Sequence, residues 1–204
     1  MAFRSKQVLS KQEAIQLHNE SLVIDSQQPP ITSGALFTEN MRKALDDWFK
    51  EGMTRAEARG LLSNMMADEI QNDQDARNQY IDMWDKSGVN VASGTYAGPS
   101  RIETAYDTSV TGISNAIGII NSIPEKLMLV TTGDHIRESH QLNKYGVIFD
   151  FQDTLPFGTD LSKVDFFYNL GLRVVQLTYN LRNLVGDGCT EYHQSGLTYF
   201  GREL

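Results

Sequence analysis

Residues 174–201 read VVQLTYNLRNLVGDGCTEYHQSGLTYFG, a short apolar segment followed by a long polar loop. Val174–Thr178 is rich in β-branched residues and predicts a buried strand. Glycines and polar side chains follow, and a helix is expected to begin near Phe200–Gly201. Enzymes of the α/β class build their sites on loops at the C-terminal ends of parallel strands. A plain connector is the simpler alternative, but connectors of this length are uncommon. We therefore interpret the loop as functional.

Upstream of this loop, short apolar segments alternate with helical patterns. Strands are predicted at residues 22–25, 89–95, 127–130, 145–151 and 173–178. Helices are predicted at residues 11–19, 39–50, 101–121, 134–143 and 160–170, with a further long helix from residue 55 to the stop at Gly88. Two capping boxes, Ser10–Glu13 and Thr54–Glu57, support two of the helix starts. The alternation predicts a parallel sheet with helices packed outside it.

Two closures of such a sheet compete. An open, doubly wound sheet usually has a glycine-rich cofactor turn after its first strand, and residues 26–29, SQQP, contain no glycine. A (β/α)8 barrel of the TIM type fits better, although a full barrel needs eight strands and about 250 residues. We therefore expect residues 1–204 to be a single domain, the N-terminal part of a barrel that is truncated after about five strands.

Composition narrows the classes of partner and site. The net charge of −8 and the lack of a basic stripe argue against nucleic acid. Cys189 is the only cysteine, which excludes an internal disulfide and a cysteine-based zinc site. The start, MAFRSKQVLSKQEA, has no apolar core of a signal peptide, and no later run reaches the ~18 apolar residues of a membrane span. We expect a cytoplasmic protein without a membrane span.

Four segments carry a resemblance to a known family. Residues 176–191, QLTYNLRNLVGDGCTE, and 195–204, SGLTYFGREL, are the most specific; residues 160–180 extend the match, and LVIDS at 22–26 does so more weakly. Together they resemble the membrane (renal) dipeptidases, which are zinc-dependent hydrolases. The resemblance implies a barrel fold, a dipeptide or similar small-molecule substrate, and zinc. It also places Tyr179, Asn180, Asn183 and Asp187 on the substrate side of the site.

The metal positions depart from the family pattern. In the family, the first strand ends in an aspartate, a small residue and a His-x-Asp pair that binds zinc. Asp25 matches the aspartate, but the pair has become Gln27 and Pro29, and the glutamate that bridges two metals falls on Gln152. Asp25 and Gln152 are therefore the candidate metal positions of this chain. Glutamine offers one neutral oxygen and proline has no side-chain ligand, so zinc binding by this chain is doubtful.

Other polar residues receive weaker interpretations. Asp150 shares a strand face with Gln152 and is a candidate for shaping the pocket. His135 and His140 are five residues apart, which is off the spacing that lets two helical histidines share a metal. Cys189 has no evident base partner, and a structural role is favoured.

Two functions follow from these observations. The first is a dipeptidase-like, metal-dependent hydrolase, of which this chain is the N-terminal part and holds no catalytic residue. The second is a non-catalytic relative that binds a small peptide-like ligand after loss of the metal site. The altered ligand positions favour the second, and the intact 176–191 segment favours a retained pocket. Open sheet edges make a homo-oligomer a further expectation.

Overall fold

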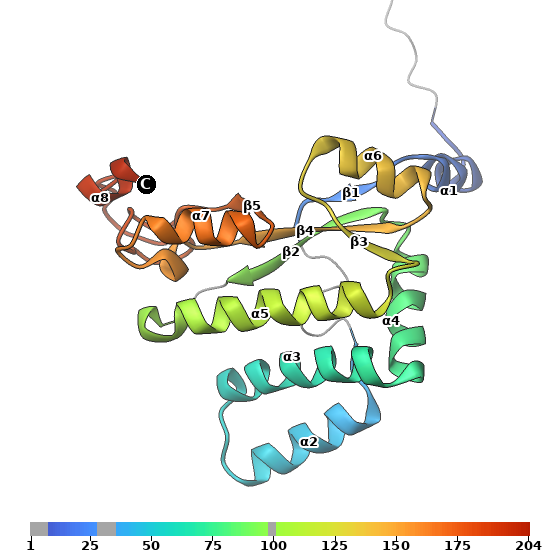
Figure 1. Cartoon of the computed structure of the whole chain (residues 1–204), viewed down its shortest axis with the longest axis horizontal. Coiled ribbons are helices and arrows are strands. Elements are labelled where there is room, and N and C mark those ends of the chain that lie inside the picture. Colours follow the sequence, from blue (N-terminus) through green and yellow to red (C-terminus); the bar gives the residue numbers. More distant parts are fainter. Residues whose placement is uncertain (1–7, 28–35, 98–100) are drawn as a thin grey trace, which may run out of the picture.

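The computed structural model describes residues 8–27, 36–97 and 101–204, so that Pro29 lies outside the described residues. All strand pairs of its five-stranded sheet are parallel. The strands, labelled in Figure 1, are β1 (Ile24–Asp25), β2 (Val91–Ala97), β3 (Leu127–Leu129), β4 (Tyr145–Phe151) and β5 (Leu172–Val175). The predicted parallel sheet is confirmed, and the bounds of β4 match the predicted strand.

The strand pairing sets β3 apart from the other four strands of the sheet. β2 pairs with β4 along one edge, whereas β3 pairs with residues 145–147 of β4 and β5 with residues 149–151. Because a strand has only two edges, β3 and β5 share the second edge of β4. β1, β2, β4 and β5 thus follow one another as consecutive barrel strands do. The strand predicted at residues 127–130 is confirmed as β3, which flanks only the first half of β4.

The helices largely confirm the sequence pattern. They are α1 (Lys11–Glu20), α2 (Glu39–Lys50), α3 (Arg55–Asn72), α4 (Gln74–Ser87), α5 (Ile102–Ser122), α6 (Gly133–Gln141), α7 (Ser162–Asn169) and α8 (Tyr199–Glu203), with a 3-10 turn at Leu155–Phe157. Both capping boxes are present, and Gly88 ends α4 at φ 67°. The single long helix was wrong. Asp73 interrupts it, because its extended backbone and its carboxylate, which accepts from Ala76 N at 2.7 Å, start a new helix.

One face of the sheet is covered by helices. Val147, Phe149 and Phe151 alternate along β4 and belong to the buried core. α5 and α7 contribute to this core, which holds Ile113 and Phe167. In Figure 1, α5 runs along this side of the sheet, with α3 and then α2 stacked beyond it. We call this side the helix-covered face.

The opposite side, which we call the inner face, is only partly covered. Residues paired across parallel strands point to the same side, so the register places together Ile24, Val91, Ser93, Thr95, Ile148, Asp150 and Val174. α6 lies over the N-terminal end of this face (Figure 1), where a Cβ on Gly146 would sit 3.2 Å from Ser139 Oγ. The sequence pattern predicted helices only on the outside of the sheet. This was wrong for α6, which lies over the inner face.

The last strand differs from its prediction in length and burial. β5 ends at Val175, and the hydroxyl of Thr178 donates to the Asp187 carbonyl instead of continuing the strand. Val174 is 48% exposed, because among the described residues β5 has a strand partner on only one edge. The prediction of a buried strand over residues 173–178 was wrong in both respects.

Candidate functional site at the strand ends

A chain of hydrogen bonds joins three strands at their C-terminal ends. The Asp150 carboxylate, on β4, accepts from Ser93 Oγ at 2.6 Å and from Thr95 Oγ1 at 2.7 Å, both on β2. Gln27, two residues after β1, donates from Nε2 to Thr95 Oγ1 at 2.7 Å. The register explains the meeting, because Thr95 pairs directly with Asp150 and Ser93 lies two residues before it on the same face. We call Gln27, Thr95, Asp150 and Ser93 the strand-end chain.

Asp150 is the buried end of this chain. The residue is 2% exposed, and burial raises the pKa of its carboxyl above the usual value. The two hydroxyl hydrogen bonds act against that shift because they stabilise the ionised carboxylate. Asp150 therefore faces the strand-end site, as its place on the strand predicted. No contact of Ser93 or Thr95 with Asp150 was predicted, although their spacing of two residues on a strand signalled a shared face.

A second set of hydrogen bonds attaches the loop after β5 to the end of β4. Asn183 donates from Nδ2 to Asp153 Oδ1 at 2.8 Å, to Thr154 Oγ1 at 3.1 Å and to the Leu177 carbonyl at 2.8 Å. Its Oδ1 accepts from the backbone N–H groups of residues 185 and 186. Asp153 and Thr154 are buried, and sequence reasoning assigned neither a role. The 176–198 loop is therefore fixed against the C-terminal edge of the sheet.

Asp187 organises the far part of the same loop. Its carboxylate accepts from the backbone N–H groups of Ser195 and Gly196 and pairs with Arg182 Nε at 3.0 Å. Asn180 is exposed, and its side chain accepts from Cys189 Sγ at 3.3 Å. The backbone carbonyl of Tyr179 accepts from Cys189 N at 2.8 Å. Cys189 thus has a structural contact, in line with its predicted role.

The glycines of this loop permit close backbone contact. A Cβ on Gly188 would overlap the carbonyl oxygen of Asn180 and the backbone nitrogen of Leu181. A Cβ on Gly201, in α8, would overlap the carbonyl oxygen of Val185. Both positions explain why the sequence places glycine there, because any side chain would force the backbone apart. The loop is a folded unit rather than a loose connector.

These contacts revise the stability expected of loop variants. Asn183→Ala is expected to lower the free energy of unfolding by roughly 2–3 kcal/mol, because it leaves buried partners without a hydrogen bond. Asn180→Ala is the matched control and should change it by less than about 0.5 kcal/mol, as usual for exposed positions. Urea titration followed by circular dichroism measures both. Equal effects of the two variants would contradict a structural role for Asn183.

The residues at the strand ends do not fit a zinc centre. Gln27 supplies an amide that is already bound to Thr95, and Asp25 Oδ1 accepts from Gln27 N at 3.0 Å. Asp25 pairs with Ala92, whose side chain lies in the helix-covered core, so it stands on the other face from Asp150. Within residues 8–27, 36–97 and 101–204, no three His, Cys, Asp or Glu side chains come together as a metal site. The assignment of Asp25 and Gln152 as metal positions stays a prediction.

The whole sequence agrees with one family. Residues 12–204 match the sequence model of the membrane dipeptidases, peptidase family M19. The chain belongs to this family. Members of the family are metal-dependent hydrolases in general, and zinc is the usual metal. No curated protein sequence matches the chain significantly.

Solved structures agree on the fold. A Pseudomonas aeruginosa amidohydrolase is 23% identical, with a TM-score of 0.58, over 93% of this chain and 43% of its own. The probable dipeptidase PvdM from the same organism is 16% identical, with a TM-score of 0.61, over 94% and 45%. A Rhodobacter sphaeroides metallopeptidase, bound to a phosphinate mimic of L-Ala-D-Ala, is 14% identical, with a TM-score of 0.56, over 67% and 51%. The chain thus spans about half the length of each, or slightly less, and the similarity shows a partial TIM-type barrel.

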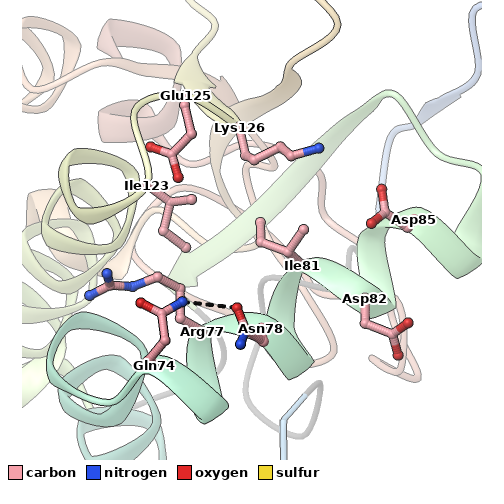
Figure 2. A pocket seen from close by; sticks show the side chains of 9 residues that line it. All are labelled: Gln74, Arg77, Asn78, Ile81, Asp82, Asp85, Ile123, Glu125 and Lys126. Atoms are coloured by element: carbon pink, nitrogen blue, oxygen red, sulfur yellow. Dashed lines mark hydrogen bonds between the residues drawn. The ribbon is translucent and has the colours of Figure 1, made fainter.

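A separate hollow of about 220 Å³ lies near the N-terminal end of β3, away from the strand-end chain. Figure 2 shows its nine lining side chains, which come from α4 and from residues 123–126. Several of its polar groups have partners within the protein: Arg77 donates to the carbonyls of Ile70 and Gln71, and Gln74 to Asn78. We assign no site there.

None of the described helices has the length and apolar character needed to span a bilayer.

Proposed function

We propose that the protein is a dipeptidase-like hydrolase that acts on a dipeptide or a similar small amide, with this chain forming one wall of its site. Family membership over residues 12–204 and the loop folded against the strand ends support the proposal. The observation that carries it is the strand-end chain, because polar groups of three strands converge where barrel enzymes bind substrate. The Rhodobacter sphaeroides relative carries a dipeptide mimic, which fits this substrate class.

The residues of this chain bind and orient the ligand in this proposal. Tyr179, Asn180, Asn183 and Asp187 belong to the loop after β5, on the same side as the strand-end chain. Asn183 and Asp187 act by holding the loop, because their side chains already have partners inside it. Tyr179 and the exposed Asn180 are left as the residues that contact the ligand. Zinc bound by this chain has no role in the proposal, since the donor groups described do not fit it.

A second function is favoured by one specific observation. The resemblance puts a family metal-ligand position on Gln27, whose amide donates to Thr95. A neutral amide already engaged in a hydrogen bond is a poor ligand for a catalytic metal. A non-catalytic relative that binds a small peptide-like ligand is therefore the alternative.

Hydrolysis and binding assays on the whole protein, with the rest of the barrel present, distinguish the two functions, because the catalytic residues are expected outside this chain. We expect the phosphinate mimic of L-Ala-D-Ala to bind in isothermal titration calorimetry, under either function. Release of alanine from L-Ala-D-Ala, with added zinc, would support the hydrolase. Binding of the mimic without any hydrolysis would support the non-catalytic relative. If the mimic does not bind, both functions are contradicted.

A further inference from the structure

The directions of the hydrogen bonds in the strand-end chain follow from counting protons. An ionised carboxylate only accepts, so the hydroxyls of Ser93 and Thr95 both donate to Asp150. A hydroxyl has a single proton, and that of Thr95 already forms the hydrogen bond to Asp150. The contact of 2.7 Å between Thr95 Oγ1 and Gln27 must therefore use an N–H of Gln27. This fixes the orientation of the Gln27 amide, with its nitrogen toward Thr95 and its carbonyl oxygen at the other end.

Gln27 is the end of the chain that lies nearer to solvent. Gln27 is exposed and lies two residues after β1, at the C-terminal edge of the sheet, whereas Asp150 is buried. Donation of its N–H to Thr95 polarises the amide, and hydrogen bonds in such a chain strengthen one another. The Gln27 oxygen is consequently a better acceptor than that of an isolated amide.

The charge around this oxygen selects the kind of ligand. Asp150 lies two hydrogen bonds behind it, and the Asp25 carboxylate accepts from the backbone N–H of Gln27 at 3.0 Å. The strand-end chain and Asp25 together hold two carboxylates and no basic side chain. Partly buried carboxylates of this kind are screened less than exposed ones. These two carboxylates favour a cationic donor at the Gln27 oxygen and disfavour a carboxylate.

We propose that the strand-end chain binds the free ammonium group of a peptide-like ligand through the Gln27 carbonyl oxygen. The inference rests on the proposed function and names its ligand class: small peptides with an unblocked amino terminus. An N-acetyl group removes the positive charge and the ammonium donors, so a blocked peptide binds more weakly. Gln27 has this role as a neutral residue at a position where the family uses a metal ligand.

Calorimetric titration of the purified protein with L-Ala-L-Ala and with N-acetyl-L-Ala-L-Ala tests the proposal. We expect the free dipeptide to bind at least about tenfold more tightly, the order of effect of one hydrogen bond to a charged group. Gln27→Leu should abolish this preference, chiefly by weakening the binding of the free dipeptide. Gln12→Leu, on the exposed surface of α1, is the matched control and should keep the preference.

The outcomes separate this inference from the proposed function. Equal binding of the two dipeptides by the unmodified protein would overturn the ammonium site and leave the peptide-binding function standing. Binding of neither dipeptide would overturn both. A preference that needs added zinc, and that Gln27→Leu does not change, would assign amine recognition to a metal and overturn the role of Gln27. Circular dichroism of the variant confirms that the exposed substitution leaves the fold intact.

Discussion

The 204-residue chain is expected to self-associate at micromolar concentration. Its inner face exposes apolar side chains that a closed barrel buries, among them Ile24, which is 47% exposed, and Val174, which is 48% exposed. Burial of apolar surface stabilises a fold by about 25 cal/mol per Å². Leaving several such side chains in water therefore costs a large part of the roughly 5–15 kcal/mol that is the typical free energy of unfolding of a domain. β1 and β5 each pair with a single strand among the described residues, which leaves parallel edges for a second chain.

Lysine substitutions on the inner face should reverse this association. Ile24→Lys with Val174→Lys is expected to convert most of the protein to monomer in sedimentation velocity, because charged side chains on an exposed face oppose pairing. Leu142→Lys with Leu161→Lys is the matched control, since both leucines are exposed but lie outside the inner face. A monomeric, sharply melting unmodified chain would contradict the expectation. It would mean that the sheet covers its inner face in another way.

Replacing Phe149 by alanine should destabilise the helix-covered face strongly. Phe149 is 0% exposed and packs edge-to-face against Tyr96, with ring centroids 4.9 Å apart. Phenylalanine-to-alanine changes in a core cost about 3–5 kcal/mol, from lost burial and from the cavity left behind. The variant is best measured in the chain that carries the two inner-face lysines, by urea titration, so that association does not contribute.

Phe49→Ala is the matched control for this experiment. Phe49 lies on α2 and is 46% exposed, so its loss should cost less than about 1 kcal/mol. If Phe149→Ala lowered the free energy of unfolding as little as Phe49→Ala does, β4 and α5 would not share a packed core. The two phenylalanines thus test whether one face of the sheet is well packed while the other is open.

Local rules predicted the elements whose limits are set by neighbouring residues. The bounds of α2 and β4 agree with prediction, because a cap or an unbroken apolar run defines each. The break at Asp73 was missed, since the apolar pattern continues across it and only the N-cap bond to Ala76 marks it. The early end of β5 was missed as well, because it depends on the lack of a second strand neighbour rather than on residues 173–178.

The contacts within the candidate site could not be predicted from the sequence. The alternation along β4 put Asp150 on the correct face, yet its partnership with Thr95 depends on the register between β2 and β4. Register is a tertiary property that the spacing of residues within one strand does not contain. The family resemblance put Asn183 and Asp187 on the substrate side of the site. Their bonds inside the loop became visible only once its turns were placed.

Zinc binding tests most directly whether the strand-end chain has replaced the family's metal site in this half of the barrel. Equilibrium dialysis of the purified chain against micromolar zinc, with metal content measured by atomic absorption, gives the stoichiometry. We expect far less than one zinc ion per chain, because Gln27 is bound to Thr95 and the donors described do not cluster. Gln27→His with Gln152→Glu should raise the zinc content, since it adds an imidazole and a carboxylate. One zinc ion per unmodified chain at micromolar affinity would contradict the replacement of the metal site.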